Sequence, residues 1–82
     1  MSHIRAHIRV ETQGDVLHLI GVLSSSEDTF SIEDFTGQNR VNARSILGML
    51  YITSECGDEV YLVNDTHDGV FPAEIDEMRA LT

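Results

Sequence analysis

The sequence predicts an α+β protein in which three helices cover one face of a four-stranded antiparallel sheet. Three observations lead to this fold class. The chain has 82 residues, 41% of them hydrophobic, which suffices for one compact domain and leaves no room for a second. Residues 3–11 alternate between apolar and polar side chains, as in a half-buried strand. The remaining segments give the order β-α-β-β-α-β-α, which typically leaves one sheet face open. We therefore expect residues 1–82 to form a single domain.

The first strand carries its apolar side chains on one face and its basic side chains on the other. The apolar set is Ile4, Ala6, Ile8 and Val10, and the other face carries His3, Arg5, His7 and Arg9. Such a pattern is typical of an antiparallel strand whose polar face is solvated. The two histidines lie about 13 Å apart along a strand and cannot share one ion. We expect no metal site.

A helix follows this strand. Asp15, after Gly14, is expected to cap it, and the helix is expected to continue through about residue 25. Helical spacing predicts that the buried stripe consists of Val16, Leu19, Ile20 and Leu23. A polar connection at 24–28 ends the helix.

Two strands and a hairpin turn come next. Residues 29–35 predict the second strand, with Phe30 and Ile32 pointing inward, and 36–39 predict the turn. Residues 40–43 form the expected third strand, which leads directly to Ser45.

The stretch 41–50 predicts a short strand that delivers Ser45 to the start of an apolar helix at about 46–54. The Ser45 hydroxyl can accept a hydrogen bond from an otherwise unpaired backbone N–H of the first turn. The next residues place apolar side chains on more than one side of a short helix: Ile46, Leu47, Met49 and Leu50. Some of this surface should stay exposed and meet a partner.

The last strand is expected at 58–64, with Val60 and Leu62 on one face. After a turn-rich loop, Pro72 favours the start of a terminal helix. Ile75, Met78 and Leu81 recur there at helical spacing.

The formal charge is −9, and all five cations are arginine. The sequence has no cluster of positively charged residues. Nucleic acids and anionic membranes bind such clusters, so we expect neither as a partner. No apolar run approaches the ~20 residues of a membrane span, and no leader pattern opens the chain, so a cytoplasmic location is expected. The single Cys56 excludes an internal disulfide, and no cofactor is expected.

Residues 45–50 read Ser-Ile-Leu-Gly-Met-Leu and residues 57–63 read Gly-Asp-Glu-Val-Tyr-Leu-Val. In this order of elements, the chain resembles the HPr family, the phosphocarrier proteins of the bacterial sugar phosphotransferase system. The resemblance is strongest over 41–63, weaker over 3–12 and in the terminal helix, and poor over 13–40. It implies an HPr-like open-faced β-sandwich. A ferredoxin-like domain is the competing fold, and it would place the first strand between two others, whereas an HPr-type sheet pairs the first and last strands at one edge.

The family's phosphorylated histidine is missing. In the family, a Gly-Ile-His-Ala-Arg-Pro-Ala segment follows the first strand, and its histidine takes the phosphoryl group from enzyme I. The corresponding loop here contains Gln13, Gly14 and Asp15, and no cation occurs between Arg9 and Arg40. A carboxylate at the helix start repels phosphate, so we predict a degenerate active-site loop without an intact catalytic motif. His18, inside the helix, is the candidate for a displaced phosphoacceptor.

The resemblance also implies a role for Ser45. In Gram-positive members of the family the matching serine is phosphorylated by a dedicated kinase, and the product recruits a transcription regulator. Its role as a helix cap alone fully explains the same serine, and we favour that interpretation over regulated phosphorylation. The candidate partner-binding residues are Arg44, Ile46, Leu47 and Leu50.

Three functions follow as hypotheses. The first is a regulatory or partner-binding relative of HPr that contacts phosphotransferase-system or transcription-regulatory proteins. The second is a phosphocarrier for sugar transport that uses His18. The third is a ferredoxin-like ligand-sensing or interaction domain. Strand order distinguishes the third hypothesis from the first two. A test for an acid-labile phosphoryl adduct distinguishes the first from the second.

Overall fold

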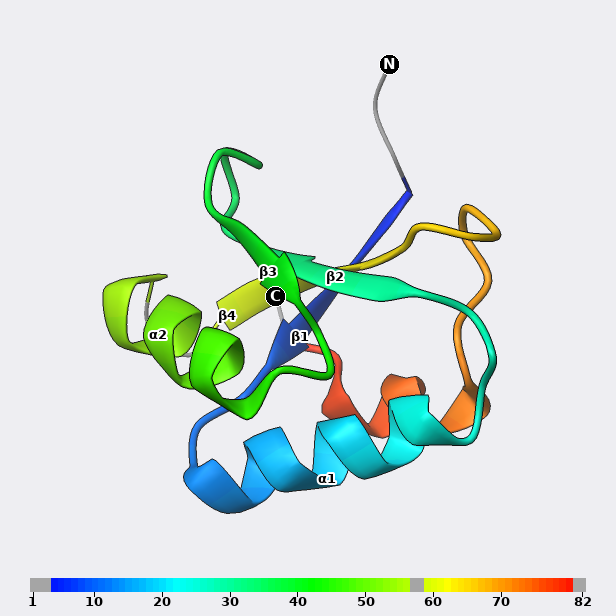
Figure 1. The fold of residues 1–82 in the computed structure, drawn as a ribbon, viewed down its shortest axis with the longest axis horizontal. Coiled ribbons are helices and arrows are strands. Elements are labelled where there is room, and N and C mark those ends of the chain that lie inside the picture. The colour runs from blue at the N-terminus through cyan, green and yellow to red at the C-terminus, as the bar shows by residue number, and fades with distance from the viewer. Residues whose placement is uncertain (1–3, 57–58, 81–82) are drawn as a thin grey trace.

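The computed structural model describes residues 4–56 and 59–80, which form a mixed α+β domain with one antiparallel sheet (Figure 1). In chain order the elements are β1 (Arg5–Arg9), α1 (Gln13–Ser24), β2 (Phe30–Glu33), β3 (Arg40–Asn42), α2 (Ile46–Cys56), β4 (Glu59–Asn64) and the 3-10 helix η1 (Ala73–Met78). The predicted α+β class, the four-stranded antiparallel sheet and the order of its elements are confirmed.

The strands lie in the order β1-β4-β2-β3, and every neighbouring pair is antiparallel. His7 of β1 is opposite Tyr61 of β4, and Ile32 of β2 is opposite Leu62 of β4. The first strand thus lies at an edge, beside the last strand. A ferredoxin-like sheet would enclose the first strand between two others, so that alternative is not the arrangement observed.

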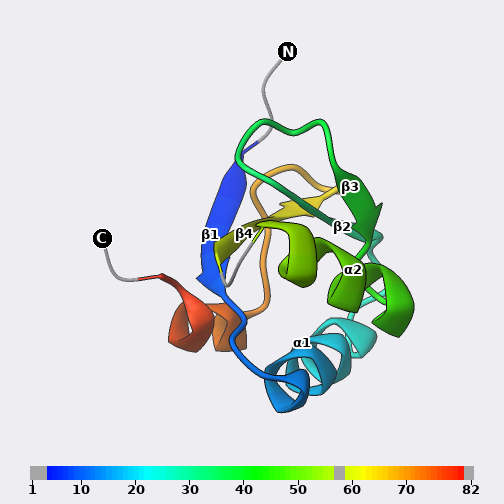
Figure 2. The same ribbon diagram turned by 90° about the vertical axis from the view of Figure 1, so that its left-hand side faces the viewer.

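Both α-helices and η1 pack against the same face of the sheet (Figures 1 and 2). The strands supply alternate residues to the core beneath them, as the sequence predicted: Ala6, Ile8, Phe30, Ile32, Val60 and Leu62. The helical layer supplies Val16, Leu19, Val22, Leu23, Met49, Ile52, Ile75 and Met78. Of the predicted α1 stripe, Ile20 is only half-buried, and Val22 is buried instead.

The start of α1 differs from the prediction. The helix begins at Gln13 with Thr12 as its N-cap, so Gln13, Gly14 and Asp15 lie in the first turn and not in a loop. The Thr12 hydroxyl accepts a hydrogen bond from the Asp15 N–H at 3.1 Å, and the Asp15 carboxylate accepts one from the Thr12 N–H, also at 3.1 Å. This reciprocal capping box satisfies two backbone donors at once and fixes the earlier start.

The C-terminal segment is also shorter than the predicted helix, since η1 covers six residues, and Leu81 lies outside the described residues. After η1 the backbone becomes extended at Arg79, which forms an antiparallel bridge with Ile8. The Ala80 N–H donates to the His7 carbonyl at 2.9 Å. This segment covers part of the free edge of β1, which would otherwise expose unpaired backbone groups.

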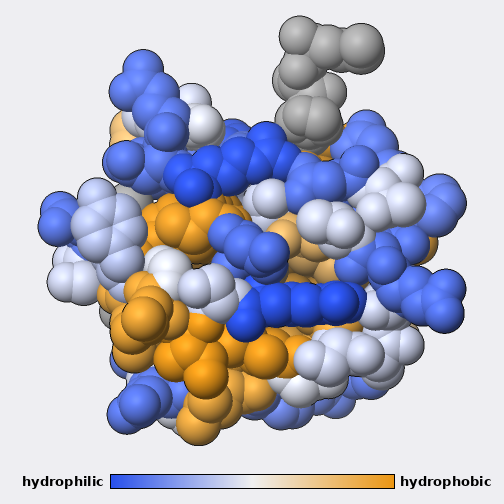
Figure 3. Space-filling model, viewed as in Figure 1, coloured by the Kyte–Doolittle hydropathy of each residue, from blue (hydrophilic) through white to orange (hydrophobic). Residues whose placement is uncertain are grey.

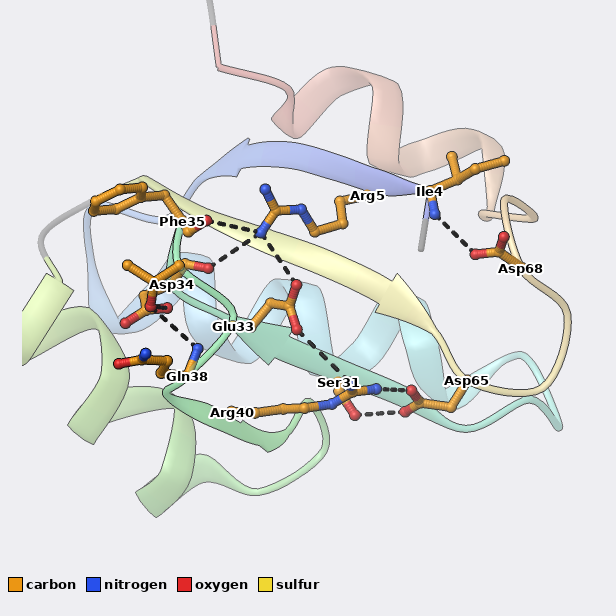
Figure 4. Close-up of polar contacts among 11 residues, drawn as sticks. Ile4, Arg5, Ser31, Glu33, Asp34, Phe35, Gln38, Arg40, Asp65 and Asp68 are labelled. Atoms are coloured by element: carbon orange, nitrogen blue, oxygen red, sulfur yellow. Dashed lines mark hydrogen bonds and ion pairs between the residues drawn. The ribbon is translucent and has the colours of Figure 1, made fainter. Parts of the chain in front are cut away.

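The opposite face of the sheet carries an ion-pair network that is less solvated than expected (Figure 4). The Glu33 side chain is only 7% exposed and lies 3.1 Å from Arg5 and 3.7 Å from Arg40. Arg40 also pairs with Asp65. Ile4, predicted to point inward, precedes the strand and is 59% exposed.

Candidate functional site

The N-terminus of α2 is built as the sequence predicted. The Ser45 hydroxyl accepts a hydrogen bond from the Gly48 N–H at 3.1 Å, and its carbonyl accepts one from the Met49 N–H at 2.9 Å. At Gly48 a Cβ would lie 3.1 Å from the Val41 Cβ, so glycine lets the helix pack closely against β3. Ser45 is exposed and accessible from solvent.

Apolar side chains project from the same helix into solvent. We call Ile46, Leu47, Leu50 and Tyr51 the α2 patch. Leu47 is 81% exposed, Tyr51 55% and Ile46 43%, whereas Leu50 is half-buried against the core. Figure 3 shows hydrophobic residues gathered over α2 and the adjoining part of α1. The expectation that some apolar surface stays exposed is confirmed.

Tyr51 was not identified from the sequence as part of this surface. The signal was present, because Tyr51 follows Leu47 by four residues and therefore lies on the same helix face. Met49 is fully buried, so it belongs to the core and not to the patch.

Arg44 has a structural contact that the sequence did not suggest. Its guanidinium donates to the Leu23 carbonyl at 2.9 Å, to the Asp28 carbonyl at 3.2 Å, and to the Ser26 carbonyl. These acceptors lie at and just beyond the C-terminal end of α1, where unpaired carbonyls favour a cation. Arg44 therefore joins the end of α1 to the start of α2.

The predicted anion-binding position at the start of α1 is occupied by a carboxylate of the chain itself. Asp15 accepts hydrogen bonds from the Glu11 N–H at 2.9 Å and the Thr12 N–H at 3.1 Å. These bonds, the one from Glu11 first, lower the pKa of Asp15 below its ordinary value. An ionised carboxylate at this position disfavours an incoming phosphoryl group.

The fold does bring cations to this region, contrary to the sequence prediction. Arg9 and Arg79 line a pocket of about 230 Å³ together with Asp15 and two glutamates. Both arginines are already paired with carboxylates. Arg9 lies 3.0 Å from Glu59 and 3.4 Å from Glu11 of the pocket lining, and Arg79 lies 2.9 Å from Asp76. Within the described residues, no histidine lines this pocket.

His18 lies in the second turn of α1 and is exposed. At that position the backbone N–H groups are bonded within the helix, so they are not available to hold a phosphoryl group on the ring. The structure places His18 apart from the unpaired N–H groups of a helix start.

A second concave feature lies beside the open face of the sheet. His7, Phe35 and Tyr61 contribute rings to a groove of about 570 Å³. One clue to this groove is visible in the sequence, where the aromatic Phe35 stands at the start of a polar turn. The pairing of His7 with Tyr61 depends on the register of β1 against β4, and no local pattern reveals that register.

Comparisons of this chain with protein-family models, with curated proteins and with solved structures gave no match. No helix in the described part of the chain is both long and apolar enough to cross a membrane. The geometry of the chain's own residues therefore carries the functional inference.

Proposed function

We propose that this chain is an HPr-like module that binds a protein partner through the start of α2 and does not transfer phosphate through a histidine. The observation that carries the proposal is the exposed Ser45 N-cap two residues before Leu47, which is 81% exposed. Together with Ile46 and Tyr51, Leu47 forms a contiguous exposed apolar surface, which is typical of an interaction site.

Strand order supports the HPr-like assignment. The order β1-β4-β2-β3, with the first and last strands paired at one edge, is the order expected of an HPr-type sheet. The helices on a single face agree with the same arrangement (Figure 2).

The start of α1 supports the absence of phosphohistidine transfer. A phosphoryl acceptor needs a neutral imidazole close to unpaired N–H groups and a cation. Here Asp15 already bonds the nearby N–H groups, and Arg9 is paired with Glu59. His18, one turn further on, faces solvent.

Ser45 is the proposed regulatory position. A phosphate there would add about two negative charges at a helix N-terminus, where the helix dipole and the first N–H groups favour an anion. The exposed hydroxyl is accessible to a kinase, and the α2 patch adjoins it. The partner would contact both Ser45 and the α2 patch.

Treatment with the family's serine kinase and ATP tests whether Ser45 is a regulatory phosphorylation site. We expect one phosphate on the wild type and none on Ser45→Ala, measured by intact mass. Ser54→Ala is the matched control, because Ser54 is an exposed serine of the same helix. Equal labelling of the wild type and Ser45→Ala, or no labelling of either, would contradict the proposal.

Incubation with phosphoenolpyruvate and enzyme I tests whether a histidine of this chain accepts a phosphoryl group. We expect no acid-labile adduct. An adduct that disappears in His18→Ala would show instead that the chain is a phosphocarrier with a displaced histidine.

Docking is tested by titrating the family's transcription regulator with the kinase-treated protein. Leu47→Ser should weaken binding by at least about tenfold, since burying one leucine side chain contributes about 1.5–3 kcal/mol and about 1.4 kcal/mol is a factor of ten.

A further inference from the structure

The groove beside the open face of the sheet has the size of a small-ligand site. Its volume of about 570 Å³ lies within the roughly 300–1,000 Å³ of typical ligand pockets. Its walls come from β1, the β2–β3 connection, the last turn of α2 and β4. None of the lining residues belongs to the α2 patch, so this inference is independent of the function proposed above.

Aromatic rings form part of the wall. The rings of His7 and Tyr61 stack with their centroids 4.6 Å apart and an interplanar angle of 17°. The Arg5 guanidinium carbon lies 4.1 Å from the centroid of the Tyr61 ring, so this ring already accepts one guanidinium from the chain itself. Phe35, which is 74% exposed, adds a third ring.

Among the described residues, three carboxylates line the groove beside these rings, and Asp34 is the most enclosed. Asp34 is held by neutral donors, the Thr36 hydroxyl at 2.7 Å and the Asn39 amide at 2.8 Å. These bonds, the one from Thr36 first, lower the pKa of Asp34. Asp34 is therefore ionised at neutral pH, and no side-chain cation bonds it within the described residues.

The other two carboxylates differ in their partners. Glu59 is shared between Arg9 at 3.0 Å and His7 at 3.4 Å. Glu55, in the last turn of α2, makes no hydrogen bond or ion pair with another described residue. Two of the three negative charges in the groove thus lack a cationic partner in the part of the chain described.

Arg5 approaches this region without neutralising either charge. Its guanidinium donates to the Glu33 carboxylate and to the backbone carbonyls of Asp34 and Phe35 (Figure 4). These bonds fix the β2–β3 connection that presents Asp34 and Phe35. A preformed wall lowers the entropy lost when a ligand binds.

From the volume, the aromatic wall and the two unneutralised carboxylates, we infer that the groove binds an organic cation, namely a guanidinium or primary ammonium group on an alkyl chain. The charged end would meet Asp34 and Glu55, and the alkyl chain would lie against Phe35 and Tyr61. Aromatic faces and carboxylates together favour this chemistry. An anionic ligand would be repelled, and a neutral apolar ligand would desolvate the carboxylates without compensation.

NMR titration of the ¹⁵N-labelled protein with N-butylguanidine tests this inference. We expect saturable shifts at residues 34–35, 55 and 59–61, whereas the uncharged analogue N-butylurea should cause none. Phe35→Ala and Glu55→Gln should each weaken binding by about threefold to fivefold, as expected for one cation–π contact or one exposed charge contact. The control Glu74→Gln removes an exposed carboxylate on η1, outside the groove, and should leave the affinity within about twofold.

A parallel titration with N-acetyl-arginine amide distinguishes the two sources of such a cation. Tighter binding of the amide assigns the groove to an arginine side chain of a polypeptide, and tighter binding of N-butylguanidine, which carries the same single charge, assigns it to a free small-molecule cation. The inference is overturned if shifts do not saturate at millimolar ligand, or if N-butylurea binds as well as N-butylguanidine. It is also overturned if Glu74→Gln weakens binding as much as Glu55→Gln does, because general attraction to an acidic chain would then account for the effect.

Discussion

Replacing Ser45 by alanine measures how much the N-cap of α2 contributes to the fold. The change removes the oxygen that accepts the Gly48 N–H at 3.1 Å and leaves that donor to water. Loss of an N-cap hydroxyl costs about 1 kcal/mol, within a range of roughly 0.5–2 kcal/mol. For a domain of this size, each 1 kcal/mol lowers the melting temperature by about 4–8 °C. Ser45→Asp keeps a side-chain acceptor and complements the helix dipole, so it should remain within about 0.5 kcal/mol of the wild type.

Urea denaturation followed by far-UV circular dichroism measures these differences. With a slope of about 1 kcal/mol per molar urea, Ser45→Ala should lower the midpoint by about 1 M. Ser54→Ala is the matched control on the same helix and should leave the midpoint unchanged or slightly raised, because alanine has the higher helix propensity. The reasoning is refuted if Ser45→Ala is as stable as Ser54→Ala, or if Ser45→Asp is less stable than Ser45→Ala.

Three further predictions concern other parts of the fold. Gly69 has a φ of +84°, and a Cβ there would lie 2.9 Å from the Ile4 Cδ1, so Gly69→Ala should lower the free energy of unfolding by about 1 kcal/mol or more in a thermal melt. Arg44→Met removes the guanidinium that holds the end of α1 and should cost about 1 kcal/mol, with faster amide exchange at residues 24–28. Thr36→Val should raise the pKa of Asp34 toward its ordinary value, measured from its ¹³C carboxyl shift. Because the folded pKa is depressed, the stability gained from Asp34 is present above pH ~4 and is lost as the pH falls through the folded value. The difference between wild type and Thr36→Val should therefore become smaller in strong acid, where only the bond from the Gln38 N–H to the Thr36 hydroxyl, at 3.1 Å, still separates the two proteins.

Elements that depend on near neighbours could be predicted from the sequence. The alternation along β1 and the apolar spacing of α2 follow from residues two to four positions apart, and Ser45 needs only Gly48 to act as a cap. Thr12 and Asp15 could each have been the cap of α1, and the reciprocal bonds between them decide for Thr12. Near η1, the spacing of Ile75 and Met78 fits both a 3-10 helix and an α-helix.

Features that depend on distant pairings could not be predicted. The groove exists because β1 and β4 pair in the register that places His7 opposite Tyr61. The cations at the start of α1 likewise arrive from Arg9 and Arg79, which are far apart in sequence. Periodicity assigns side chains to a face but does not say which strand lies beside which.

The positions of the five arginines constrain what this chain can bind. Each makes an ion pair or hydrogen bond within the described chain: Arg5 with Glu33, Arg9 with Glu59, Arg40 with Asp65, Arg44 with backbone carbonyls and Arg79 with Asp76. The remaining carboxylates give the chain its excess of negative charge, −9 overall. An anionic ligand would therefore have to displace an ion pair or, at Arg44, the bonds to backbone carbonyls, whereas the α2 patch suits an apolar partner and the groove suits a cation. A phosphate on Ser45 would likewise find the adjacent Arg44 already held by three backbone carbonyls. Its charge would then act mainly on the partner, so Ser45→Asp should change partner affinity while leaving the free energy of unfolding nearly unchanged.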